Sequence, residues 1–245
     1  MNNINNNSLE NLVTINNLTK SYGSCVALKN VFLNLPKGKI VGLLGPNGSG
    51  KTTLIKILTN LIKNYQGTVL INNQELGIYS KSIISYLPDR TFLAEKWSIK
   101  YIIEYFNDFF KDFDAEKAKY LITNFGINLD QSFKSLSKGM KEKVQLSLIL
   151  SRKAELYIFD EPIAGVDPAT RDVIFQLILS HRSPNSTILI STHLVSEVEE
   201  ILDSVILLKN GEVIYNGSKE ELIDIHEGKN VNDIFREVYK YEGII

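Results

Sequence analysis

A single stretch constrains the fold of this chain more than any other part of it. It reads Gly45-Pro46-Asn47-Gly48-Ser49-Gly50-Lys51-Thr52-Thr53, and it fits the pattern G-x-x-x-x-G-K-[ST] at every fixed position. An apolar run over residues 40–44 precedes it, and a mostly apolar run over residues 54–58 follows it. This order predicts a buried strand, a glycine-rich turn and a helix.

The residue types in this stretch suit a polyphosphate. Gly45, Gly48 and Gly50 let the backbone adopt positive φ and approach a ligand closely. The free N–H groups at the start of the helix, together with the helix dipole, face the anion. Lys51 can reach the outer phosphates, and the Thr52 hydroxyl can ligate Mg²⁺. An ordinary glycine turn would not require the full motif, so we predict that residues 45–53 bind a nucleoside triphosphate with Mg²⁺.

Length and composition set outer bounds on the chain. Its 245 residues fit one large domain or a domain with an inserted lobe. A formal net charge of −1 gives no basic excess that would indicate a nucleic-acid partner. The single cysteine, Cys25, excludes an internal disulfide framework and is compatible with a reducing compartment. No apolar run is long enough to span a bilayer, and the start does not resemble a signal peptide. We expect a cytoplasmic protein with a flexible tail over residues 1–10.

Short apolar runs alternate with helical patterns through most of the chain. The runs at residues 12–18 and 25–35 predict an N-terminal β part, and Asn210-Gly211 predicts a hairpin turn late in the chain. Buried strands are predicted at residues 83–87, 156–159, 187–190 and 205–208. The expected fold class is α/β: a mostly parallel sheet flanked by helices, of the phosphate-loop NTPase type, with an antiparallel N-terminal part.

The pattern is purely helical from about residue 98 to residue 151. Apolar residues recur at helical spacing on one face of the first segment: Ile99, Ile102, Ile103, Phe106, Phe110 and Phe113. Asp114 is a suitable cap for a second helix, which Gly126 ends, and a third helix should begin near Ser137. We therefore predict one domain over residues 1–245, with a helical lobe inserted at residues 91–151.

Two acids follow the strand predicted at residues 156–159. In a parallel sheet, such a strand delivers its last side chains to the edge where ligands bind. We predict that Asp160 holds Mg²⁺ beside Thr52. Glu161 would orient or deprotonate the water that attacks the phosphate.

Three further polar or aromatic residues follow strands, and each has a simpler alternative. His193 could contact the γ-phosphate, although a lone histidine at a helix start is more often a cap or a surface group. Asp89 could reach the metal or the water, or it could be a turn residue. Tyr22 could stack on a nucleotide base, or it could be a half-buried loop tyrosine.

Leu136-Ser137-Lys138-Gly139-Met140 resembles the signature motif, usually Leu-Ser-Gly-Gly-Gln, of ATP-binding cassette (ABC) ATPases. The other motifs of that family then occur in order from about Leu12 to Tyr215. In the family's terms, Tyr22 matches the adenine-stacking residue, and Asp89 occupies the glutamine-loop position. Asp160 and Glu161 match the magnesium aspartate and the catalytic glutamate. Asp167, in Ala164-Gly165-Val166-Asp167, matches the aspartate that crosses the dimer, and His193 matches the switch histidine.

The resemblance implies an ATPase that works as a head-to-tail dimer. The family holds each ATP between the phosphate loop of one subunit and the signature of the other. Ser137, Lys138, Gly139 and Asp167 are therefore expected to contact the ATP bound by the second chain. Lys51, Glu161, His193 and Asp89 are the expected catalytic residues, with Thr52, Asp160 and Asp89 at Mg²⁺.

Three positions depart from the family pattern. Lys138 and Met140 replace glycine and glutamine in the signature, and Asp89 replaces the usual glutamine. Lys138 would add a cation near the phosphate of the partner's ATP, whereas Met140 cannot hydrogen-bond as glutamine does. Asp89 would place negative charge near the phosphates. We expect a functional but slow ATPase.

The resemblance also suggests a transporter. Without a membrane span of its own, the chain would drive a separate membrane-spanning subunit from the cytoplasmic face of the membrane, as a homodimer or as a heterodimer with another ABC ATPase. The segments Ser-Lys-Gly-Met and Ala-Gly-Val-Asp-Pro are similar to the drug, peptide and lantibiotic exporter branch, which favours export of drugs, peptides or lipids. Tyr101, Tyr105 and Phe109 fall on a second face of the first lobe helix, which fits either docking or internal packing.

Two other classes compete with the transporter. Soluble ABC-type ATPases that act on DNA or ribosomes usually carry a coiled-coil insertion, a zinc module or two cassettes. This chain has one phosphate loop, one signature and one cysteine, so no nucleic-acid partner is expected. A nucleotide-dependent scaffold without turnover is disfavoured by Lys51, Asp160, Glu161 and His193.

Overall fold

The structure is a computed structural model that describes residues 10–240. The tail predicted over residues 1–10 lies outside the described residues, apart from Glu10. That residue is tied to Lys37 by its carbonyl oxygen, at 2.9 Å from the Lys37 backbone nitrogen, and by its carboxylate, at 2.6 Å from the ammonium.

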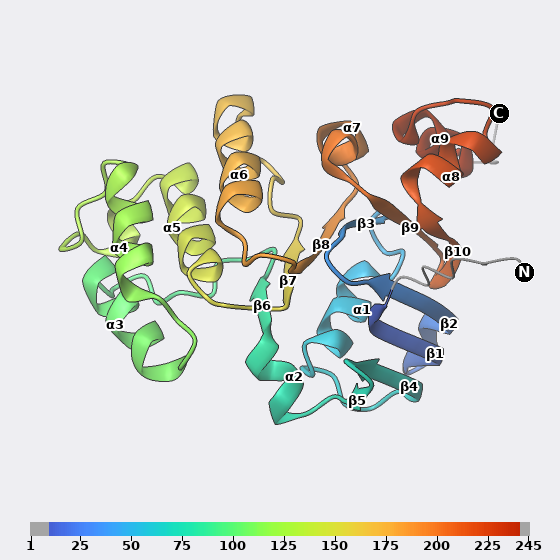
Figure 1. Cartoon of the computed structure of the whole chain (residues 1–245), viewed down its shortest axis with the longest axis horizontal. Helices are drawn as coiled ribbons and strands as arrows, with labels where there is room; N and C mark the ends of the chain where they lie inside the picture. The colour runs from blue at the N-terminus through green and yellow to red at the C-terminus, as the bar shows by residue number, and fades with distance from the viewer. Residues whose placement is uncertain (1–9, 241–245) are drawn as a thin grey trace, which may run out of the picture.

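The first sheet is antiparallel and has four strands in the order β2-β1-β4-β5. They are β1 (Asn11–Tyr22), β2 (Cys25–Pro36), β4 (Gln66–Ile71) and β5 (Gln74–Glu75). In β2, buried Val31, Leu33 and Leu35 alternate with exposed residues, as expected for a sheet with one face in the core. The predicted N-terminal antiparallel part is therefore present, and β4 joins it (Figure 1).

The second sheet carries the predicted parallel strands, in the order β10-β9-β3-β8-β7-β6. They are β3 (Ile40–Leu44), β6 (Ile84–Leu87), β7 (Leu156–Asp160), β8 (Thr187–Thr192), β9 (Ser204–Lys209) and β10 (Glu212–Ser218). All neighbouring pairs are parallel except β9 and β10, which form a hairpin. Every residue of β3, β7 and β8 is buried, because layers cover both faces of the sheet.

Two hydrophobic clusters cover the two faces of this sheet. On one side, α1 (Lys51–Leu58) lies between the sheets, and its apolar residues share a cluster with strands of both. On the other side lie α6 (Pro168–His181), α7 (Val195–Val198), α8 (Lys219–Ile225) and α9 (Val231–Val238). The predicted α/β class, with a mostly parallel sheet flanked by helices, is confirmed.

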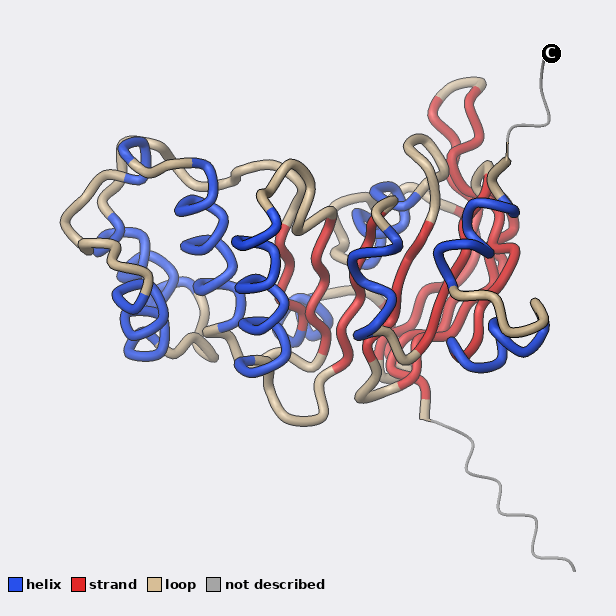
Figure 2. Tube along the Cα trace, turned by 90° about the horizontal axis from the view of Figure 1, so that it is seen from above, coloured by secondary structure: helices blue, strands red, loops and turns tan. Residues whose placement is uncertain are grey.

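Three helices between β6 and β7 pack around a core of their own. They are α3 (Ile99–Phe109), α4 (Ala115–Asn124) and α5 (Lys138–Leu150), capped by Ser98, Asp114 and Ser137. Figures 1 and 2 show them at one end of the molecule, beside the strands. The division into one domain with a lobe at residues 91–151 remains our proposal. The predicted face of α3 is too long, since the helix ends at Phe109 and leaves Phe110 and Phe113 outside it.

Arg152 joins this helical region to the parallel sheet. Its buried guanidinium donates to the carbonyl oxygens of Ile84 at 2.6 Å and Ser82 at 2.9 Å. It also donates to the Asp112 carboxylate at 3.0 Å and lies over the Phe110 ring. Arg152 therefore connects Asp112, in the segment after α3, to the backbone of β6 through a partly buried ion pair.

Two short helices were not predicted from the sequence. They are α2 (Ile78–Ile83) and α8 (Lys219–Ile225), whose lengths leave little room for helical periodicity. Among residues 10–240, no helix is both long and apolar enough to cross a membrane.

Candidate functional site

The glycine-rich loop connects β3 to α1, as the sequence predicts. Gly48 and Gly50 have φ of 83° and 111°, in the left-handed region that favours glycine. Gly45 does not share this conformation, so our prediction of positive φ there is wrong. Glycine is needed at that position for close approach, since a Cβ would lie 2.5 Å from the Leu208 carbonyl oxygen and 2.5 Å from the Ser49 hydroxyl.

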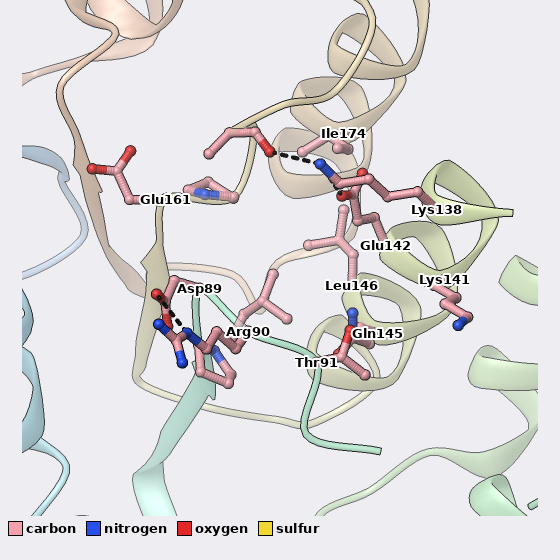
Figure 3. Close-up of a pocket in the computed structure, with 14 residues that line it drawn as sticks. Asp89, Arg90, Thr91, Lys138, Lys141, Glu142, Gln145, Leu146, Glu161 and Ile174 are labelled. Atoms are coloured by element: carbon pink, nitrogen blue, oxygen red, sulfur yellow. Dashed lines mark hydrogen bonds and ion pairs between the residues drawn. The ribbon is translucent and has the colours of Figure 1, made fainter. Parts of the chain in front are cut away.

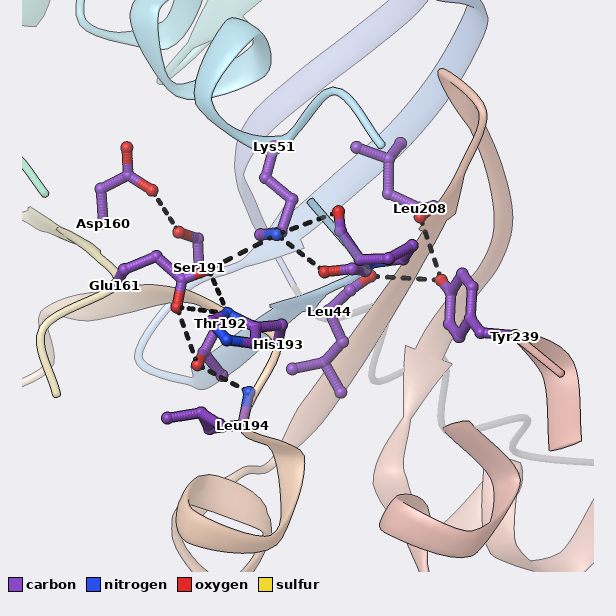
Figure 4. Close-up of polar contacts among 12 residues, drawn as sticks. Leu44, Lys51, Asp160, Glu161, Ser191, Thr192, His193, Leu194, Leu208 and Tyr239 are labelled. Atoms are coloured by element: carbon purple, nitrogen blue, oxygen red, sulfur yellow. Dashed lines mark hydrogen bonds and ion pairs between the residues drawn. The ribbon is translucent and has the colours of Figure 1, made fainter. Parts of the chain in front are cut away.

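Lys51, the first residue of α1, is held inside this loop. Its ammonium donates to the carbonyl oxygens of Gly45 at 2.7 Å and Pro46 at 3.3 Å (Figure 4). The Glu161 carboxylate lies 3.5 Å away. Burial lowers the pKa of Lys51, and the nearby Glu161 charge works against that shift. The loop therefore concentrates a cation at the position where the outer phosphates would bind.

Asp160 ends β7 and is fully buried. One of its carboxylate oxygens accepts a short hydrogen bond from the Ser191 hydroxyl of β8. The other, Oδ2, has no hydrogen-bond partner among the described residues. Burial raises the pKa of Asp160, and the hydrogen bond from the Ser191 hydroxyl partly opposes that rise. An orphaned, buried carboxylate oxygen of this kind is available to a cation.

Glu161 follows Asp160 in a conformation that is rare for a non-glycine residue, with φ of 51°. Its backbone N–H donates to the Ser191 carbonyl at 3.0 Å. Its carboxylate accepts from the Thr192 hydroxyl at 3.1 Å and lies 3.0 Å from His193 Nδ1. With Lys51 at 3.5 Å, three of the predicted catalytic residues meet at one carboxylate (Figure 4). Such a backbone outlier is held in place by its surroundings, as is common at functional sites.

Asp89 follows β6 and lies beside this cluster rather than inside it. It lines a cavity of about 160 Å³ together with Glu161, Lys138 and Glu142 (Figure 3). Its carboxylate lies 3.9 Å from the Arg90 guanidinium. Within residues 10–240 it makes no hydrogen bond or ion pair to Asp160 or Glu161. Its charge nevertheless contributes to the raised pKa of Asp160.

The Ser137 region lies at the start of α5. The Ser137 hydroxyl accepts from the Met140 N–H at 3.3 Å and so caps the helix. The Lys138 ammonium donates to the Gly165 carbonyl at 2.9 Å, within the loop before α6. In the described part of the chain, no hydrogen bond or ion pair connects Ser137, Lys138 or Gly139 to the loop at residues 45–53. A single copy therefore does not bring the two motifs together.

A family model described as "ABC transporter" matches residues 28–164, which is more than half of the chain. The chain belongs to the ABC transporter family.

Curated relatives agree with this ABC assignment. The chain is 33% identical to "Lantibiotic transport ATP-binding protein SrtF" of Streptococcus pyogenes, over 87% of this chain and 96% of the relative. It is 29% identical to "Lipopolysaccharide export system ATP-binding protein LptB" of Haemophilus influenzae, over 90% of this chain and 96% of the relative. The chain is thus an ATP-binding subunit of the ABC transporter type, and membership of this family implies use and hydrolysis of ATP.

Solved structures agree as well. "Structure of ATP binding subunit of ABC transporter" superimposes with a TM-score of 0.85 at 26% identity, covering 94% of this chain and 100% of that one. "Crystal structure of a nucleotide-free ATP-binding cassette from an ABC transporter" has a TM-score of 0.74 at 22% identity, over 89% and 96% of the two chains. The second likeness supports the fold alone.

Two predicted nucleotide contacts of this ABC subunit lie apart from the cluster at Glu161. Tyr22 ends β1 and is half exposed, with the Lys20 ammonium 4.8 Å from its ring centroid. Asp167 caps α6 by accepting from the Thr170 N–H at 3.0 Å, and hydrogen bonds from Thr170 lower the pKa of Asp167. Both side chains are exposed, so they are open to a ligand or to a second chain.

Sequence reasoning missed two polar residues of β8. Ser191 bonds Asp160, and Thr192 bonds Glu161. Both stand in a run that the sequence shows only as the end of a buried strand. Pairing of β7 with β8 aligns Asp160 with Ser191, and this register could not be read from the sequence.

Proposed function

We propose that this chain hydrolyses ATP as a dimer and drives a separate membrane-spanning subunit of an exporter. The observation that carries the proposal is the cluster in which Lys51, Thr192 and His193 surround the Glu161 carboxylate beside the phosphate loop. Hydrolysis needs a cation that binds the phosphates and a carboxylate that takes a proton from the attacking water. Here a histidine lies next to that carboxylate.

Each residue has a specific task in this proposal. The loop N–H groups at residues 45–53 and the Lys51 ammonium bind the phosphates, while the Tyr22 ring stacks on the base. Incoming phosphate competes with Glu161 for Lys51 and so frees the carboxylate. Glu161 then takes a proton from water as the water oxygen bonds to the γ-phosphorus and the bond to the bridging oxygen breaks. His193 Nδ1 holds the carboxylate in orientation.

The residues present also fit Mg²⁺. This ion takes oxygen ligands, and the unpartnered Asp160 Oδ2 and the Thr52 hydroxyl supply them at the end of β7 and the start of α1. Asp89, after the neighbouring β6, is a further candidate. When bound, Mg²⁺ would neutralise charge on the phosphates. Between residues 10 and 240, no group of three or more His, Cys, Asp and Glu side chains is placed to hold a metal ion.

The separation of the two motifs within one chain supports a dimer. Among the described residues, no hydrogen bond or ion pair joins Ser137, Lys138, Gly139 or Asp167 to their own phosphate loop, and all four are accessible or partly accessible. We propose that they complete the ATP site of a second cassette, which is either another copy of this chain or a related ATPase. ATP would hold the two cassettes together, and its cleavage would release them.

Mixing two inactive variants tests this arrangement. Lys51→Ala removes the phosphate-binding cation. Gly139→Asp adds a carboxylate to the signature, and the structure accommodates a Cβ there, 3.6 Å from Thr170. Each variant alone should hydrolyse almost no ATP. In an equal mixture, only a dimer that contains both variants has an intact site, and it has one, so about a quarter of the wild-type rate should return with random pairing and up to about half if ATP favours the mixed dimer. No recovery, with both variants folded, would contradict a shared site.

The α3 surface supports a membrane-spanning partner. Trp97 and Tyr101 have ring centroids 5.0 Å apart, Trp97 and Tyr105 also 5.0 Å, and Tyr105 and Phe109 5.9 Å. Tyr101, Tyr105 and Phe109 are 48%, 41% and 67% exposed. These side chains form a contiguous aromatic strip, whereas scattered single apolar residues are ordinary on a protein surface, and such a strip suits an apolar partner surface. The names of SrtF and LptB, which refer to lantibiotic transport and lipopolysaccharide export, favour export as the direction.

Purification from detergent-solubilised membranes tests the partner and the peripheral, cytoplasmic-face location that we propose. The tagged wild-type chain should bring a membrane-spanning polypeptide with it, whereas Tyr101→Glu with Phe109→Glu should not. Tyr120→Glu is a matched control, because Tyr120 is 61% exposed on α4, outside the strip. Equal recovery with all variants would contradict docking at α3. Salt-sensitive binding of the pure chain to DNA would contradict the transport proposal.

A further inference from the structure

The C-terminal helix α9 ends against the base of the phosphate loop. The Tyr239 hydroxyl, directly after α9, is shared between the Leu208 carbonyl oxygen at 3.0 Å and the Leu44 carbonyl oxygen at 3.3 Å (Figure 4). Leu44 is the last residue of β3, and Gly45 follows it. The phenol therefore binds the backbone at the point where the strand becomes the loop.

Further contacts make this junction rigid. The Lys209 ammonium donates to the Val238 carbonyl at 2.8 Å, which fixes the end of α9 to β9. The Gly211 N–H, in the turn between β9 and β10, donates to the Ser49 carbonyl at 2.9 Å. The loop and the end of α9 share a cavity of about 440 Å³, which residues 46–49 of the loop line together with Lys209 and Tyr239.

The other end of α9 is fixed to the segment that follows His193. The Glu199 carboxylate accepts hydrogen bonds from the backbone N–H groups of Val231 at 3.0 Å and Asn232 at 3.2 Å. A negative charge at this position is favourable, because it lies at the positive end of the dipole of α9. Val231 and Ile234 are buried against this segment and the sheet. The contacts at the N-terminal end of α9 thus help to fix the position of Tyr239, which follows the C-terminal end of the helix.

We propose that Tyr239 is a positioning residue for the phosphate loop. Its hydroxyl orients the Leu44–Gly45 peptide, and the next carbonyl, that of Gly45, binds the Lys51 ammonium at 2.7 Å. A loop held in this way is organised before a nucleotide arrives, so less ordering is required on binding. Burial raises the pKa of Tyr239, so the phenol remains a donor throughout the physiological range. The inference rests on the proposed role of the loop in phosphate binding.

The test compares two tyrosine-to-phenylalanine changes. Tyr239→Phe keeps the ring, which packs 4.4 Å from the Phe235 centroid, and removes only the hydroxyl. Tyr215→Phe is the matched control, because its hydroxyl donates to the Ser218 carbonyl at 2.7 Å, in β10 and away from the loop. Calorimetry gives the Kd of each folded protein for Mg-ADP, and steady-state kinetics give KM and kcat for ATP.

Loss of one hydrogen bond at the loop base should weaken Mg-ADP binding about three- to tenfold in Tyr239→Phe and raise KM by a similar factor. The saturated kcat should stay within about twofold, and Tyr215→Phe should match wild type. An unchanged Kd, an equal loss in both variants, a fall in kcat alone, or a Tyr239→Phe chain that does not fold would each overturn the proposal. Because Mg-ADP binding needs neither hydrolysis nor dimerisation, a wild-type protein that binds without turnover would contradict only the proposed function.

Discussion

Replacing Asp160 by asparagine should stabilise the nucleotide-free protein and abolish its response to magnesium. Asp160 is fully buried, and its Oδ2 atom has no partner among the described residues. Asparagine keeps an oxygen that can accept from Ser191, as Asp160 does, and removes the buried charge. Since neutral groups are less costly to bury than charged ones, the change should stabilise the nucleotide-free protein and weaken only the binding of Mg²⁺.

The size of the gain follows from the burial. A buried, unpaired polar group destabilises by about 1–3 kcal/mol, and more if charged. The side-chain NH2 group of the asparagine would be unpaired but neutral, so we expect the free energy of unfolding to rise by about 1 kcal/mol. For a chain of this length, that free energy corresponds to about 2–4 °C in Tm.

The pH dependence has a definite sign. Burial raises the pKa of Asp160 above its ordinary value of 3.8, so the folded state binds this proton more tightly than the unfolded chain does. The stability it contributes is fully present below pH 3.8 and is lost as the pH rises through the pKa of the folded state. Asp160→Asn should therefore remove part of the fall in stability between that pH and neutrality.

Thermal unfolding followed by circular dichroism measures both effects. Without nucleotide, Asp160→Asn should melt above wild type. With Mg-ADP at about 100 times its Kd, wild type should gain about 2.7 kcal/mol, and the magnesium-dependent part of that gain should vanish in the variant. Asp114→Asn is the control, because asparagine caps α4 equally well and Tm should not change. A lower Tm for nucleotide-free Asp160→Asn, or an undiminished magnesium response, would refute the reasoning.

Two further predictions concern stability and nucleotide affinity. Arg152→Met should lower stability by about 3–5 kcal/mol, because it leaves Asp112 and two backbone carbonyls without their donor. The exposed Arg236→Met should leave Tm within about 2 °C of wild type, and equal melting of both variants would contradict the structural role of Arg152. Tyr22→Ala should raise the KM for ATP by about fivefold or more, whereas Tyr22→Phe should not, if base stacking is worth at least 1 kcal/mol. Unchanged KM in Tyr22→Ala, measured by steady-state hydrolysis, would remove Tyr22 from the site.

Motifs with local physical causes could be predicted from the sequence. The phosphate loop, the acids at the end of β7 and the cap at Asp114 each depend on residues within a few positions of one another. Apolar runs and helical spacing also indicated the order of most strands and helices, apart from α2 and α8. Their prediction needed no knowledge of distant contacts.

What the sequence did not indicate depends on contacts between distant segments. Ser191 reaches Asp160 only because β8 pairs with β7, and Tyr239 reaches Leu44 across 195 positions of sequence. The requirement for Gly45 likewise comes from the distant Leu208 carbonyl rather than from its own φ. Helix α3 ends earlier than its apolar face suggested, because Phe110 and Phe113 join the same core from outside the helix.

In the proposed mechanism, ATP brings two cassettes together and Glu161 ends this state by promoting hydrolysis. Sedimentation velocity of Glu161→Gln tests this, with Glu155→Gln, just before the same strand, as the control. We expect Glu161→Gln to be a dimer in saturating Mg-ATP and a monomer in Mg-ADP, and Glu155→Gln to hydrolyse ATP still. A Glu161→Gln chain that stays monomeric in saturating Mg-ATP would contradict it.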